Sequence, residues 1–156
     1  MNQADLTILI NHVAGTLGLD ANLCLAIAQH ETGLDSSKTR YEPQWNYFCF
    51  PRKFASQLGI SELTEKILQA ISWGPLQVMG AVTRELGYTG QLSLLVEPEL
   101  GTLFGCRKLK SLSEKYSDEK DVISSFNAGG PRKVGGLYSN QPYVDDVVKR
   151  LTALRG

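Results

Sequence analysis

The chain has 156 residues, of which 42% are hydrophobic and 21% charged, and its 16 basic residues balance 16 acidic ones. A chain of this length suits one domain and buries roughly 70% of the surface that it exposes when unfolded. The composition excludes a disordered or membrane-embedded protein, and the balanced charge excludes the strong positive field that attracts nucleic acid. We therefore expect a single domain over residues 1–156, with no nucleic-acid partner and no stable membrane insertion.

Two amphipathic helices are expected in the first 33 residues. In the first of them, apolar residues recur at three- and four-residue steps: Leu6, Ile10, Val13 and Leu17. This helix should end near Gly18. Asp20 then has the side chain of an N-cap, the run 21–32 has one apolar face, and Gly33 supplies the stop.

The segment 34–52 has no helical period, because proline, asparagine and aromatic residues interrupt it, and it predicts a long ordered loop or a short hairpin. Loops of this length usually serve a function. Strand signals stay scarce beyond it. Further helices are expected at 53–58, at 61–71, at 74–86 with Pro75 in first position, from about Pro98, from about Asp118 to the string FNAGG, and at about 142–154. In the helix from Pro98, the spacing of the apolar residues leaves Lys108 on the solvated face. The sequence therefore predicts a compact all-α domain of about seven to eight helices with a long loop after the second.

The three cysteines, Cys24, Cys49 and Cys106, are odd in number and widely spaced, which argues against a disulfide framework and against a zinc site. Reduced and mostly buried thiols are expected instead. Neither His12 nor His30 has a second ligand at metal-binding spacing. We predict no metal and no cofactor.

Glu31 stands in the last turn of the helix expected at 21–32, followed at once by Thr32 and Gly33. The negative end of the helix dipole and the apolar neighbours Ile27 and Ala28 both favour the protonated form of its carboxyl. A carboxylic acid that is neutral near physiological pH can protonate a leaving oxygen, as glycosidic cleavage requires. The alternative is a glutamate that is simply solvated at a helix end.

Two other strings have the residues of a ligand site. SWGPLQVMG, residues 72–80, combines glycines, a helix-starting proline and Gln77, whose amide both donates and accepts; the alternative is a helix start with Trp73 packed in the core. SFNAGG, residues 125–130, ends a helix in small residues that let a ligand approach, and Asn127 offers an amide. The alternative for the second string is an ordinary helix stop.

Taken together and in this order, the three strings resemble the lytic transglycosylase family with the goose-type lysozyme fold. That family has a catalytic glutamate followed by serine, then G-L-M-Q, then A-Y-N-A-G, then a tyrosine on the final helix. The matching positions here are Glu31-Thr32, Gly74-Pro75-Leu76-Gln77, Ser125-Phe126-Asn127-Ala128-Gly129 and Tyr143. RYEPQWNY, residues 40–47, and SWGPLQVMG look like the phage-encoded branch in particular. The resemblance covers about residues 17 to 151.

The chain departs from the family pattern at several positions. Thr32 replaces serine and keeps a hydroxyl, so little change is expected. Phe126 replaces tyrosine and loses the phenolic hydroxyl, which puts in doubt any polar contact made there. Pro75 and Leu76 replace leucine and methionine, so the turn stays apolar.

The resemblance implies a compact lysozyme-like fold and cleavage of the β-1,4 bond between N-acetylmuramic acid and N-acetylglucosamine in peptidoglycan. One glutamate, here Glu31, would protonate the glycosidic oxygen and then accept the proton of the muramoyl C6 hydroxyl, leaving a 1,6-anhydromuramoyl end. Tyr41, Trp45, Tyr47 and Trp73 could stack on sugars or pack. The substrate-binding residues implied are Thr32, Glu42, Gln77, Phe126, Asn127, Ala128 and Tyr143.

Two rival functions stay open. A hydrolytic muramidase needs a second carboxylate, for which Glu42 is the first candidate and Asp35 the second. Alternatively, Glu42 has a structural role, paired with Arg40 or Arg52. The second rival is a non-catalytic glycan-binding module of a virion.

The amino terminus has no basic segment before its apolar residues, so no secretory signal is expected. This fits a phage protein that is made in the host cytoplasm and reaches the periplasmic cell wall within a virion or at lysis. The partners implied are glycan strands and a virion or lysis apparatus, with the protein itself a monomer.

Overall fold

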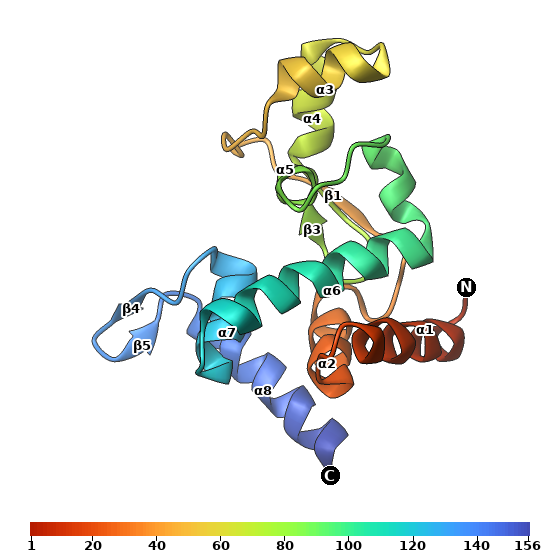
Figure 1. Cartoon of the computed structure of the whole chain (residues 1–156). Helices are drawn as coiled ribbons and strands as arrows, with labels where there is room; N and C mark the ends of the chain where they lie inside the picture. The colour runs from red at the N-terminus through yellow and green to blue at the C-terminus, as the bar shows by residue number, and fades with distance from the viewer.

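The computed structural model of the chain describes all residues from 1 to 156, and its architecture is mostly helical (Figure 1). Eight α-helices are present, in agreement with the predicted number. They are α1 (Gln3–Thr16), α2 (Ala21–Thr32), α3 (Pro51–Leu58), α4 (Glu62–Gln69), α5 (Gly80–Glu85), α6 (Pro98–Lys115), α7 (Glu119–Ala128) and α8 (Gln141–Arg155), with a short 3-10 helix, η1 (Leu92–Val96). None of these helices is both long enough and apolar enough to cross a membrane.

Two small antiparallel sheets make the strictly all-α prediction wrong in detail. Strands β1 (Thr39–Tyr41), β2 (Ile71–Trp73) and β3 (Val78–Met79) form one sheet in that order. Strands β4 (Lys133–Val134) and β5 (Leu137–Tyr138) form a hairpin. The segment 34–52 therefore does not form a hairpin: its strand β1 pairs with β2, about thirty residues further along the chain.

The helix expected at 74–86 is wrong in its first half. Residues 74–77 form a turn between β2 and β3, and α5 begins only at Gly80. Gly74 has a φ of +73°, and a Cβ at this position would lie 3.0 Å from the Cα atom of Gly101 in α6. The backbone passes α6 too closely for a side chain there, and the pairing of β2 with β3 outweighs the local helical pattern.

Helices α1 and α2 form as the sequence predicts. The side chain of Asp20 accepts a hydrogen bond from the backbone N–H of Asn22 at the start of α2, and Gly33 ends the helix in the left-handed conformation. Because α2 lies among α1, α6 and α8, seven of its twelve residues are buried and none is fully exposed. Its last turn, which carries Glu31, is thus fixed by the surrounding core.

The core has two parts, joined by the long helix α6 that crosses the middle of the molecule (Figure 1). The larger part is built from α1, α2, α6, α7 and α8. The smaller part packs Trp73, Leu92, Leu95 and Phe104. Trp73 is therefore a core residue, which is the alternative that the sequence left open for the string SWGPLQVMG.

The buried polar groups include one ion pair and two of the three cysteine thiols. Glu65 on α4 and Arg84 on α5 form an ion pair with no exposed side-chain surface, Nε to Oε1 2.8 Å, which joins the two helices. The thiols of Cys24 and Cys106 are buried and that of Cys49 is half-buried, in agreement with the prediction of mostly buried cysteines. These contacts hold the frame of the molecule and lie away from the cleft described next.

Candidate active site

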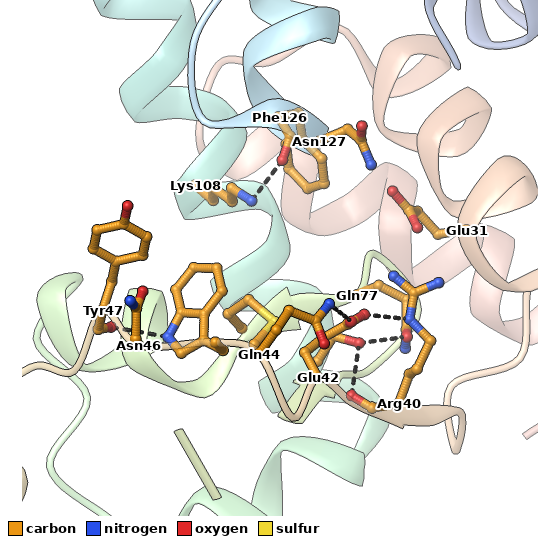
Figure 2. A pocket seen from close by; sticks show the side chains of 13 residues that line it. Glu31, Arg40, Glu42, Gln44, Asn46, Tyr47, Gln77, Lys108, Phe126 and Asn127 are labelled. Carbon is orange, nitrogen blue, oxygen red and sulfur yellow. Dashed lines mark hydrogen bonds and ion pairs between the residues drawn. The ribbon is translucent and has the colours of Figure 1, made fainter. Parts of the chain in front are cut away.

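A cleft of about 310 Å³ separates two kinds of structure (Figure 2). On one side, here called the helical wall, lie Glu31 from α2, Lys108 from α6, and Phe126 and Asn127 from α7. On the other side, here called the sheet wall, lie Arg40, Glu42, Ser72, Gln77 and Met79. The loop of residues 44–47 closes one end. The cleft therefore brings together Glu31, Gln77 and Asn127 from three separate strings of the sequence.

Glu31 points into this cleft with its carboxyl partly withdrawn from water. Tyr143 on α8 donates a hydrogen bond from its hydroxyl to Oε1 of Glu31, at 3.0 Å. Burial raises the pKa of the Glu31 carboxyl above its ordinary value of 4.5, and this outweighs the hydrogen bond from Tyr143 and the nearby charges of His30, Lys108 and Arg40, which lower it. A raised pKa favours the protonated form of the carboxyl, which is the form that a general acid needs.

Tyr143 is itself buried against α2 and does not line the cleft. Burial and the neighbouring Glu31 both raise the pKa of its phenol well above 10. The phenol thus keeps its proton over the physiological range and remains a hydrogen-bond donor to the carboxyl. It acts on Glu31 from behind rather than from the substrate side.

Lys108 was expected to be solvated, and this expectation is wrong. Its Nζ atom donates to the backbone carbonyl of Phe126 at 2.7 Å and lies 4.3 Å from the centroid of the Phe126 ring. Burial of the ammonium lowers the pKa of Lys108 to about 8, while Glu31 opposes the shift. The helical spacing placed Lys108 on a polar face of α6, but that face meets the end of α7 instead of solvent.

Asn127 is the residue of the third string that reaches the cleft with a free polar group. Its Oδ1 atom accepts a hydrogen bond from Asn140 at 2.9 Å, so its amide N–H group faces the cleft near Glu31 (Figure 2). Phe126 is buried and lines the same wall of the cleft. Ala128 is exposed but does not line the cleft.

Gln77 lies in the cleft, although not one turn into a helix as expected. It adopts a positive φ of +52° in the turn before β3. Its Nε2 atom donates to the carbonyls of Lys38 and Gly74, both at 2.9 Å, and its Oε1 atom accepts from Ser72 at 2.8 Å. Both amide hydrogens are therefore used within the protein, and the side chain fixes the turn.

Thr32 is buried beneath the same turn and does not line the cleft. Its hydroxyl oxygen lies 3.0 Å from the carbonyl of Pro75 and 3.1 Å from that of Ala28, and it accepts from the backbone N–H of Asp35 at 3.2 Å. The residue after the candidate catalytic glutamate thus joins the end of α2 to the turn that carries Gln77. Its position indicates a structural contribution to the cleft.

Glu42 lines the sheet wall with its carboxylate already engaged. Arg40 donates to its Oε1 atom at 2.5 Å and Gln44 to its Oε2 atom at 3.1 Å. Arg52 pairs with Glu62 instead. The expected partner is therefore Arg40, and the carboxylate of Glu42 still borders the same cleft as Glu31.

Asp35 does not line the cleft. Hydrogen bonds from Ser37 hold the pKa of its carboxyl below the ordinary value. Of the four aromatic residues that could stack on sugars, Trp45 and Tyr47 line the end of the cleft. Tyr41 is exposed outside it and Trp73 is buried in the core.

No group of three or more His, Cys, Asp or Glu side chains is close enough together to hold a metal ion. Comparison of the chain with family models, with curated proteins and with solved structures found no match. A functional assignment therefore depends on the residues of the cleft and on the resemblance between short sequence strings.

Proposed function

We propose that this protein is a peptidoglycan lytic transglycosylase with a lysozyme-like fold and that Glu31 is its general acid and base. One observation carries the proposal: the carboxyl of Glu31 has a raised pKa, is held by Tyr143 and opens into a cleft with the Asn127 amide. A group of this kind can donate a proton to a leaving oxygen and take one back.

The reaction would proceed in two proton transfers. First, protonated Glu31 gives its proton to the glycosidic oxygen as the bond from the muramoyl C1 atom breaks. The resulting carboxylate then accepts the proton of the muramoyl C6 hydroxyl as that oxygen bonds to C1. Atoms balance without water, and Glu31 ends in its protonated starting form. Lys108 and Arg40 are the cations whose charges would favour the carboxylate between the two transfers.

The Asn127 amide would donate to a substrate carbonyl or hydroxyl, and Trp45 and Tyr47 would carry the sugar rings at the end of the cleft. Gln77 and Thr32 would act differently from the residues that touch sugar, because their polar atoms are taken by the protein. They would keep the turn of the sheet wall at a fixed place opposite Glu31.

A hydrolytic muramidase is the second candidate, because Glu42 borders the same cleft as Glu31. In that mechanism Glu42 would leave Arg40 to activate water or to stabilise the sugar cation. Its present hydrogen bonds favour a structural role.

The test is digestion of purified peptidoglycan, with the fragments weighed by mass spectrometry. A transglycosylase releases anhydromuramoyl ends, which are lighter by one water than the reducing ends left by hydrolysis. Glu31→Gln should release neither. Unchanged digestion by this variant would refute the catalytic role of Glu31 in both mechanisms, whereas binding of glycan without digestion by the parent protein would leave the glycan-binding module. The proposed activity is compatible with delivery of the protein to the cell wall either within a virion or at lysis.

A further inference from the structure

A second layer of side chains joins α2 to α8 behind Glu31. The ring of His30, the residue before Glu31, meets the ring of Tyr143 edge-on, with centroids 4.6 Å apart and planes at 75°. Tyr143 in turn donates to Glu31. One tyrosine ring is therefore fixed against His30 and bonded through its hydroxyl to Glu31, two neighbours on the same helix.

Asp146 holds the imidazole of His30 in place. It lies one turn beyond Tyr143 on α8, and its Oδ2 atom is 2.6 Å from Nδ1 of His30 and 2.6 Å from Nε of Arg150. The hydrogen bonds from Arg150 and then from His30 lower the pKa of the Asp146 carboxyl, which is therefore ionised and can only accept. Nδ1 of His30 must then carry a hydrogen, which fixes the tautomer and the ring plane.

We propose that His30 and Asp146 are a positioning pair that keeps the Tyr143 ring in the orientation in which its hydroxyl donates to Glu31. Neither residue lines the cleft. The pair would act on the carboxyl only through Tyr143, and it is distinct from the sugar-binding groups. This inference deepens the proposed function and rests on it for any effect on cleavage, but the geometry that it predicts can be measured without substrate.

A simpler account is that the pair only fastens α8 to α2. The molecule contains a second polar contact between these helices for comparison: Arg155 near the end of α8 donates to Asp20 at the start of α2 and to Glu119 on α7. Both contacts join α8 to its neighbours by ion pairs. Only the pair of His30 and Asp146 contacts Tyr143, so the two accounts predict different results when each of the two interhelical contacts is removed.

The first measurement is the titration of the Glu31 carboxyl by carbon-13 NMR in the free protein. The hydrogen bond from Tyr143 lowers the pKa of Glu31, so Tyr143→Phe should raise it by about one pH unit. His30→Leu should raise it in the same direction, because a mobile tyrosine ring makes the bond less often. An unmoved pKa in His30→Leu overturns the proposal.

His30 has a charge effect of its own on Glu31, which also lowers the pKa of the carboxyl. The double variant His30→Leu with Tyr143→Phe separates the two effects. If His30 acts through Tyr143 as well as by its charge, the rise in the double variant is smaller than the sum of the rises in the two single variants. If the two rises add in full, His30 acts only by charge, and the positioning role is wrong.

In Asp146→Ala, the direction of the change in the Glu31 pKa distinguishes the two accounts. Any direct effect of removing the negative charge of Asp146 would lower the pKa of the Glu31 carboxyl, whereas loss of the Tyr143 hydrogen bond should raise it. We expect a rise. A fall would mean that Asp146 contributes only its charge.

Arg155→Gln is the control for a general loss of contact between α8 and its neighbours. It should lower the midpoint of thermal unfolding and leave the Glu31 titration where it was, whereas His30→Leu should change both. If Arg155→Gln moves the titration as much as His30→Leu does, the effect reflects general loosening of α8 and the proposal is wrong.

Cleavage rates complete the test. His30→Leu should lower kcat about as much as Tyr143→Phe does, with KM nearly constant, and should have no further effect in the Tyr143→Phe background. If the wild-type protein cleaves no peptidoglycan, the proposed function has failed, and the titration results still decide on the positioning pair.

Discussion

The two walls of the cleft differ in how their polar groups are satisfied. On the sheet wall, the amide of Gln77 is bonded to the protein through both of its atoms and the carboxylate of Glu42 is paired with Arg40. On the helical wall, Glu31 has a raised pKa and one hydrogen bond from behind, and Asn127 presents a free N–H group. The polar groups of the sheet wall therefore maintain its structure, and in the proposed function the helical wall provides the groups that react.

This contrast has a physical origin. Helix ends converge on the helical wall: α2 and α7 both end there in a glycine with positive φ, which brings the last side chains to the surface while the helix bodies stay in the core. The sheet wall is a turn and a short three-stranded sheet, whose backbone needs side chains such as Gln77 to satisfy its carbonyls. If this division is right, substitutions on the two walls should affect different quantities.

The largest effect is expected for Glu31→Gln on the helical wall. Loss of a general acid and base typically lowers a rate by about 10²–10⁴-fold, and the amide keeps the shape of the side chain. The release of anhydromuramoyl fragments from purified peptidoglycan measures it. Glu42→Gln is the matched variant on the sheet wall, and it should retain most of the activity.

The contrast between the walls is wrong if the two variants do not differ in activity. A loss of activity in Glu42→Gln as large as that in Glu31→Gln would assign chemistry to both carboxylates. It would also favour the hydrolytic mechanism, provided that the products then carry ordinary reducing ends.

The next effect concerns Tyr143→Phe. Removing its hydroxyl takes away the hydrogen bond that steadies the Glu31 carboxyl, and we expect kcat to fall about tenfold, equivalent to about 1.4 kcal/mol at the barrier. Since Tyr143 lies behind the cleft, KM should change little. A large rise in KM with constant kcat would instead indicate direct contact between the hydroxyl and the sugar.

A smaller effect, on stability more than on chemistry, is expected for Gln77→Ala on the sheet wall. The variant leaves the carbonyls of Lys38 and Gly74 without their donor, so the free energy of unfolding should fall by about 1–3 kcal/mol. Urea unfolding measures this. At a temperature where the variant is folded, kcat should be close to that of the parent, and a loss comparable to that of Glu31→Gln would contradict the division between the walls.

The helical wall was largely predictable from the sequence because its signals are local. Asp20, the apolar face of the run 21–32 and Gly33 fix α2 and hence the place of Glu31, and the glycines after Asn127 fix the end of α7 in the same way. Each of these signals lies within a few residues of the element that it controls.

The sheet wall was not predictable in this way, since its structure depends on partners far along the chain. β1 pairs with β2 across about thirty residues, and the close approach of Gly74 to Gly101 is visible only in three dimensions. Lys108 was misassigned for the same reason: the carbonyl that binds it belongs to another helix. The spacing of apolar residues cannot report such contacts.

The smallest effect, and the one that isolates the environment of the helical wall, is the pH dependence of stability. Burial raises the pKa of Glu31 above its ordinary value of 4.5, so the folded protein binds this proton more tightly than the unfolded chain does. The associated stability is present below pH 4.5 and is lost as the pH rises through the raised pKa. Glu31→Gln removes this loss, because the amide does not ionise.

The Glu31→Gln variant should therefore match the parent in free energy of unfolding below pH 4.5 and exceed it at about pH 7. Urea unfolding at several pH values measures the difference. Glu42→Gln serves as the control on the sheet wall: it breaks the pair with Arg40, so it should lower stability at neutral pH. At neutral pH, Glu31→Gln should raise the free energy of unfolding and Glu42→Gln should lower it. These opposite changes are expected only if the Glu31 carboxylate destabilises the folded protein while Glu42 stabilises it. Equal signs would mean that the two carboxylates occupy equivalent environments and that the walls do not differ in the way described.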